Sequence, residues 1–113
     1  MILHLNKKQI NLKVKKLSEI GKIFGLMFRT KNTQNLLFKF EKPTRMAIHS
    51  IFVFHKFLAI WTDDKNKILE YQIIRPFTLY IKPKNKFYKL IEIPLNDKNI
   101  KTLKSSTGNT IFK

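Results

Sequence analysis

The sequence contains no cysteine among its 113 residues. That absence excludes disulfides, thiolate catalysis and cysteine-ligated zinc or iron–sulfur centres. It also agrees with a reducing compartment, and we expect a cytoplasmic protein. The first ten residues, MILHLNKKQI, hold too short an apolar run for a signal peptide, and lysines follow that run rather than precede it.

Long apolar runs are also lacking. The most apolar stretch, AIHSIFVFHKFLAIW over residues 47–61, is shorter than the roughly 18 residues that a spanning helix needs and contains Lys56. A charge near the centre of a bilayer costs about 2.5–3.5 kcal/mol on insertion scales. We therefore expect no transmembrane segment, and we expect residues 47–61 to form a wall of the hydrophobic core.

Acidic residues are scarce. The chain has seven Asp and Glu residues and 23 Lys and Arg residues, which gives a formal net charge of +16. Such a field attracts polyanions, including nucleic acids and acidic proteins. A second explanation is biased base composition, because Lys, Asn, Ile and Phe are frequent and their codons are rich in A and T. The sequence leaves both explanations open.

Residue patterns typical of catalysis are missing too. His49 and His55 would lie about 20 Å apart on an extended strand, too far to share a metal ion. Ser50 adjoins His49, but neighbours on a strand face opposite ways, so this pair cannot act as nucleophile and base. There are no paired carboxylates, no P-loop and no dinucleotide-binding glycine pattern. We predict no metal site and no cofactor; no catalytic constellation is visible, so the sequence favours a non-catalytic protein while leaving an enzyme open.

The residues that are present suit one domain over 1–113, since 43% are hydrophobic and can fill a core. Alternating apolar and polar residues over 9–17 predict a half-buried strand that pairs with residues 2–5 across a turn at 6–8. A stripe of apolar residues at helical spacing predicts a packed helix near 19–29, with Ser18 as N-cap.

The rest of the chain reads mostly as short strands. We predict a turn at 41–44, a hairpin loop at 63–67 with Asn66 in the left-handed conformation, and a short helix or turn over 95–106. The predicted strands are 36–40, 45–53, 57–62, 68–75, 77–82 and 86–93, with a further edge strand over 110–113. The fold class is therefore mainly β (a β-rich α+β fold), as a compact small barrel-like or folded-over antiparallel sheet with one packed helix.

Four segments carry a resemblance to a known family. GLMFR (25–29), LLFKF (36–40), AIHSIFVF (47–54) and IWTDDKNKI (60–68) follow one another in an order that resembles the domain of unknown function 192 family, also called uncharacterised protein family 0127. The resemblance runs from about Ser18 to Pro94. It implies a single mainly-β domain with one packed helix, and it supplies no activity.

The chain departs from that family at two places. Lys56 and Leu58 stand where the family has Pro and Asp, and Gly108-Asn109 stands where it has Gly-Asp. If the family's Asp binds a ligand or acts in catalysis, this chain has lost or replaced it. If that Asp only satisfies backbone donors in a turn, the loss is structural.

The strongest functional signal is YIKPKNKFYK over residues 80–89, where lysines interleave with aromatic residues. Lysines neutralise phosphates, and exposed rings stack on bases for about 1–3 kcal/mol each. Three arginines in the whole chain argue against reading of specific bases. The alternative is a solvated turn whose rings face inward. The predicted nucleic-acid contacts are Lys13, Lys15, Lys82, Lys84, Lys86, Tyr88 and Lys89.

Two further hypotheses stay open. Arg29 and His49, which match the family pattern, would form a small-ligand or enzymatic site, with Arg29 binding an anionic group; alternatively, Arg29 caps or pairs within the core. The third hypothesis is a structural or adaptor protein whose basic face meets an acidic partner. The sequence gives no oligomeric state.

Overall fold

The computed structural model describes residues 1–17, 26, 29–50 and 52–112. Apart from Leu26 and Arg29, the helix predicted near 19–29 lies outside these described residues. Among the residues described, no helix combines the length and the apolar character that crossing a bilayer requires.

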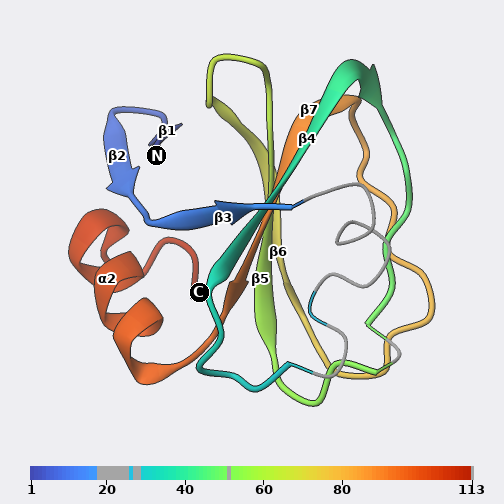
Figure 1. The fold of residues 1–113 in the computed structure, drawn as a ribbon. Helices are drawn as coiled ribbons and strands as arrows, with labels where there is room; N and C mark the ends of the chain where they lie inside the picture. The colour runs from blue at the N-terminus through green and yellow to red at the C-terminus, as the bar shows by residue number, and fades with distance from the viewer. Residues whose placement is uncertain (18–25, 27–28, 51, 113) are drawn as a thin grey trace.

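A five-stranded sheet forms the centre of the molecule (Figure 1). Its strand order is β3 (Val14–Lys16), β4 (Asn35–Thr44), β7 (Phe87–Pro94), β5 (Phe57–Thr62) and β6 (Ile68–Ile74). The β3–β4 pair is parallel and the other pairs are antiparallel. A separate hairpin joins β1 (Ile2–Leu5) to β2 (Lys8–Asn11), and the helix α2 spans Asp97–Thr107. The mainly-β prediction is confirmed; in the described part of the chain the sheet is open rather than a closed barrel, with β3 and β6 at its edges.

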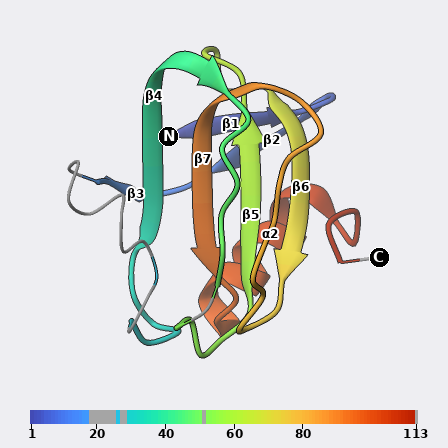
Figure 2. The same cartoon turned by 90° about the vertical axis from the view of Figure 1, so that its right-hand side faces the viewer.

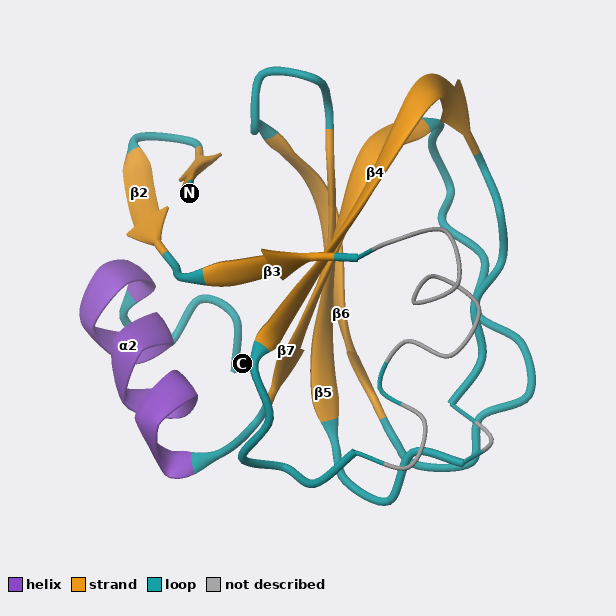
Figure 3. Ribbon diagram, viewed as in Figure 1, coloured by secondary structure: helices purple, strands orange, loops and turns teal. Residues whose placement is uncertain are grey.

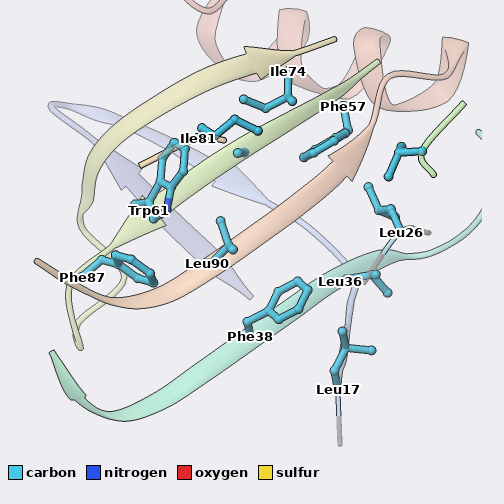
Figure 4. Packing of buried hydrophobic residues seen from close by; sticks show 12 residues of the cluster. Leu17, Leu26, Leu36, Phe38, Phe57, Trp61, Ile74, Ile81, Phe87 and Leu90 are labelled. Carbon is cyan, nitrogen blue, oxygen red and sulfur yellow. The ribbon is translucent and has the colours of Figure 1, made fainter. Parts of the chain in front are cut away.

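The two faces of the sheet have different covers (Figures 1 and 2). The helix α2 and the β1–β2 hairpin lie over one face, here called the α2 face. Two irregular segments, 45–56 (of which residue 51 is not described) and 75–86, run over the other, here called the loop face; they are teal loops on the right of Figure 3. Each face has its own apolar cluster. The α2-face cluster contains Leu3, Ile10, Leu12, Leu58, Ile60, Ile68, Ile91, Ile93, Leu103 and Ile111. The loop-face cluster, drawn in Figure 4, contains Leu17, Leu26, Leu36, Phe38, Val53, Phe57, Ala59, Trp61, Ile74, Ile81, Phe87 and Leu90.

The β5–β6 hairpin forms as predicted. All six residues of β5 are buried, because its alternate side chains enter the two clusters in turn. Asn66 adopts the left-handed conformation, at φ 67°. The Asp63 carboxylate accepts hydrogen bonds of 2.9 Å from the backbone N–H groups of Lys65 and Lys67, which fixes the loop.

The N-terminal hairpin is also confirmed, and Asn6 in its turn has φ 55°. The single strand predicted over 9–17 is wrong, because the chain leaves one sheet and enters the other between β2 and β3. The apolar alternation still holds across this bend: Ile10 and Leu12 are buried, while Lys13 is exposed. Alternation therefore predicted the buried side correctly but did not reveal the change of partner.

The strands predicted over 45–53 and 77–82 are wrong. Both segments are irregular. Within the described residues, they pair as strands do at one isolated antiparallel bridge, between Ile48 and Ile81. The core wall predicted over 47–61 is confirmed for residues 57–61, which are all buried, and for Val53, and Ile48 packs against the same cluster. It is wrong for Phe52 and Phe54, which are exposed. In place of a regular ladder, the Arg75 carbonyl and the N–H groups of Phe77 and Thr78 bond to Ser50.

The remaining differences lie at chain turns. The predicted turn at 41–44 belongs to β4; Pro43 lies where the register with β7 shifts, between Lys39 and Thr44, so its missing N–H interrupts no ladder bond there. Residues 110–112 form turns instead of an edge strand, because local bonds such as Phe112 N–H to Asn109 O, at 3.2 Å, satisfy the backbone. The 95–106 segment is helical and forms α2, with Asn96 as N-cap.

Candidate nucleic-acid interface

Residues 82–86, here called the basic loop, present three exposed lysines: Lys82, Lys84 and Lys86. The backbone of this loop is fixed at several points. Arg45 donates to the Pro83 carbonyl at 3.2 and 3.3 Å, and the backbone N–H groups of Lys84 and Asn85 donate to the Glu70 carboxylate at 3.0–3.1 Å. The loop therefore holds its lysines toward solvent on a fixed base.

The aromatic residues around the basic loop differ in accessibility. Tyr80 is 67% exposed, whereas Phe87 is fully buried and packs edge-to-face against Phe40 and Trp61. Tyr88 is half-buried. Tyr80 can therefore meet a base, and Phe87 cannot.

Lys89 lies half-buried on β7 and its ammonium donates to Asn66 Oδ1 at 2.7 Å. Lys39 stands directly opposite it on β4. Cross-strand neighbours of like charge repel, so this pair adds to the positive field at the price of some stability.

Lys13 and Lys15 lie far from the basic loop. Lys15 is opposite Leu36 near the start of β4, and Phe87 is opposite Thr44 at its end. Eight residues of strand separate these two positions on β4, or about 25 Å. The predicted lysines therefore form two groups at opposite ends of the sheet.

Lys13 instead lines a polar cleft of about 270 Å³ beside the start of α2, here called the amide cleft. Its lining residues are Lys13, Val14, Asn32, Thr33, Gln34, Asn35, Asn96, Lys98 and Asn99. Its amides already serve the fold: Asn99 Nδ2 donates to Asn35 Oδ1 at 3.0 Å, and Asn96 Nδ2 donates to the Lys31 carbonyl at 2.8 Å. Sequence reasoning missed this cleft, although the polar run NTQN over 32–35 was a signal for it.

Arg29 and His49 were the residues of the small-ligand hypothesis. Arg29 is half-buried and donates to Thr33 Oγ1 at 3.5 Å, while His49 is exposed. Neither residue lines the amide cleft, the neighbouring cleft at Lys31 and Asp97, or the hollow along β6. No group of three or more metal-ligating side chains occurs within the part of the chain that the structure describes.

Ser50 is buried and serves the fold. Its hydroxyl donates to the Arg75 carbonyl and accepts from the Thr78 N–H, both at 2.7 Å. Its backbone N–H donates to the Thr78 carbonyl, and its carbonyl accepts from the Phe77 N–H. This serine joins the two segments of the loop face.

Glu92 is a buried carboxyl that sequence reasoning did not single out. It lies on β7 between Leu36 and Ala59 of the neighbouring strands, and it is 5% exposed. Burial raises the pKa of Glu92 to about 8, so the carboxyl is mostly protonated at neutral pH. Its Oε1 atom and the Trp61 Nε1 atom on the same face have no hydrogen-bond partner among the described residues.

The comparison with protein-family models gives no match, and the comparison with curated proteins gives none either. The resemblance to the domain of unknown function 192 family therefore stays a prediction. Two solved structures have a similar fold. One is a protein of unknown function from Novosphingobium aromaticivorans, with a TM-score of 0.73, 11% identity, and coverage of 89% of this chain and 75% of that one. The other, from Sinorhizobium meliloti, is described as a "putative transcription regulator", with a TM-score of 0.73, 15% identity, and coverage of 90% and 81%. At these identities the likeness shows the fold alone.

Proposed function

We propose that this protein is a non-catalytic binding module whose lysine-rich surface engages a nucleic-acid backbone with weak sequence selectivity. The basic loop is the observation that carries the proposal. Its three exposed lysines stand on a backbone that is already anchored by Glu70 and Arg45, so binding would cost little ordering of the main chain.

The surroundings of the basic loop support an anionic partner. Residues 71–91 contain five lysines and arginines and no Asp or Glu. The nearby carboxylate of Glu70 is engaged by two backbone N–H groups of the loop. Lysines act as mobile point charges that follow a phosphate backbone, whereas arginine forks are the commonest readers of guanine.

The test is retention of a labelled 20-nucleotide probe at two salt concentrations. With about six phosphate contacts, affinity falls by ~10³ between 50 and 200 mM salt. Binding that is equal at both concentrations, or absent at 50 mM, rejects the proposal.

A pair of triple variants locates the contact. In the first, Lys82, Lys84 and Lys86 are changed to Gln; in the control, the exposed Lys7, Lys65 and Lys101 are changed to Gln. Both lose three charges. We expect the first variant to reduce the slope of log affinity against log salt by about 1 per lysine, and the control to change it far less. Equal effects would show that the basic loop is not the contact.

A further inference from the structure

The loop face carries an exposed apolar patch that the basic loop does not explain. Its members are Phe52, Phe54, Phe77, Leu79 and Tyr80, here called the ring patch, and they are exposed by 45, 60, 57, 75 and 67%. Four of the five are aromatic. Phe54 and Phe77 come from different segments and meet edge-to-face, with ring centroids 5.4 Å apart. This contact joins the two segments at the surface.

The two segments are held together beneath the patch. Ser50 bonds to Arg75, Phe77 and Thr78, and the Ile48–Ile81 bridge continues the contact. Val53 and Ile81 point into the core, while their neighbours Phe54 and Tyr80 point outward. The two segments run side by side over the loop face in Figures 1 and 2. The rings thus project from an anchored base.

Phe77 is in the left-handed backbone region, at φ 61°. A bulky residue there costs roughly 1–2 kcal/mol, and asparagine or glycine would avoid much of that cost. The ring of Phe77 is 57% exposed, so core burial offsets little of it. The edge-to-face contact with Phe54 offsets part of this cost, by about 0.5–1.5 kcal/mol. A strained ring that is still mostly exposed suits a contact outside the chain.

The charge around the ring patch fits a polyanion. Residues 42–62 and 71–91, which include both segments, contain eight lysines and arginines and no Asp or Glu. Lys56, Arg75 and Lys82 are each within two residues of a ring-patch member and are exposed. Ile81 alone separates Tyr80 from the basic loop, so rings and lysines are neighbours along the chain.

We infer that the ring patch stacks on unpaired bases, and that the nucleic acid bound by this protein is single-stranded RNA or DNA. This inference rests on the proposed function and adds the class of nucleic acid. Each stacked base contributes about 1–3 kcal/mol, and stacking tolerates any sequence. Bases in a duplex are stacked on each other and cannot reach the patch, whereas exposed rings beside lysines are the combination that binds single strands.

The experiment measures binding of labelled (dT)15, (rU)15, a 15-base-pair duplex and heparin at 50 mM salt. The variant combines Phe54→Ala, Phe77→Asn and Tyr80→Ala, where asparagine suits the left-handed backbone at 77. The control is Ile2→Ala, an exposed apolar residue (44%) on the β1–β2 hairpin across the sheet. We expect the triple variant to bind both single strands about tenfold more weakly or worse, with the same salt slope and the same heparin binding, and the control to match the parent.

Other outcomes separate the two proposals. If the duplex binds as tightly as the single strands, or the triple variant binds (dT)15 as the parent does, the stacking inference fails while the backbone-binding function stands. Binding to vesicles of phosphatidylserine and phosphatidylcholine is measured as well. If the triple variant no longer binds these vesicles but still binds (dT)15 as the parent does, the patch is a membrane contact and the inference is overturned. If nothing binds the parent at 50 mM salt, the proposed function itself fails.

Discussion

The two faces of the central sheet are built from the same strands but in different ways. On the α2 face, aliphatic residues of β5 and β7 pack against α2 and the N-terminal hairpin, in a cluster without a buried charge. On the loop face, the alternate residues of the same strands are Phe57, Trp61 and Glu92, and irregular segments with exposed rings lie over them. Both faces therefore bury an apolar cluster, but regular elements cover one and irregular segments with exposed rings cover the other, where we place the proposed binding.

The largest effect is expected on the α2 face, at Leu58. This residue stands where the resemblance places the family's Asp, and it is fully buried among aliphatic side chains. Leu58→Asp would bury an unpaired carboxylate and should lower the free energy of unfolding by more than about 4 kcal/mol. Urea denaturation measures this, with Leu58→Met as a control that should cost less than about 1.5 kcal/mol. If Leu58→Asp lowers the free energy of unfolding by less than about 1 kcal/mol, the new carboxylate reaches a hydrogen-bond donor or water. The α2 face would then not exclude water at position 58.

A smaller effect is expected on the loop face, at Glu92. Its pKa of about 8 in the folded protein is above the ordinary 4.5, so the folded state holds this proton more tightly than the unfolded chain. The contribution to stability is therefore full below about pH 4.5, falls as pH rises, and levels off above about pH 8. At pH 7 the loss is on the order of 3 kcal/mol.

Glu92→Gln removes that titration. The difference in unfolding free energy between the parent and this variant, followed by urea denaturation from pH 4.5 to 8.5, should shift toward the variant as pH rises. Parallel pH profiles would show that the carboxyl stays ionised in the folded protein and that the loop face is wetter than described.

The smallest of these effects is expected at Ser50. Ser50→Ala leaves the Thr78 N–H and the Arg75 carbonyl without their partner, at a cost of about 1–3 kcal/mol. The control is Ser105→Ala on the exposed side of α2, which should be nearly neutral. Limited proteolysis should cut the Ser50 variant faster within 45–56 and 75–86. Equal cutting of both variants would mean that this serine does not hold the ring patch in place.

The regular elements of the fold were largely predictable from the sequence. The β5–β6 hairpin followed from a short apolar run and the DDKNK loop, and the Asn66 conformation was predicted with it. Strand β7 was predicted within one residue at either end. These elements depend on local patterns, which the sequence displays directly.

The loop face was predicted poorly for a physical reason. Residues 45–53 and 77–82 are rich in residues that favour strands, yet half of those side chains point to solvent, and the backbone bonds to Ser50 replace a ladder. Composition alone does not distinguish a ring that packs inward, such as Phe87, from one that projects outward, such as Tyr80. The separation of Lys15 from the basic loop depends on strand register, which no local pattern specifies.

The short β3 strand has one more consequence. It covers only Asn35–Leu37 of β4, so the rest of that strand, Phe38–Thr44, has no neighbour on its outer side in the described residues. Wherever no other part of the chain pairs with it, a strand edge invites a second copy to add a strand and start aggregation. Lys39, Lys42 and Pro43, all exposed, oppose such an addition by charge repulsion and by a missing donor. Lysines on an edge strand thus have a use that needs no bound partner, which is to disfavour pairing between copies of the chain.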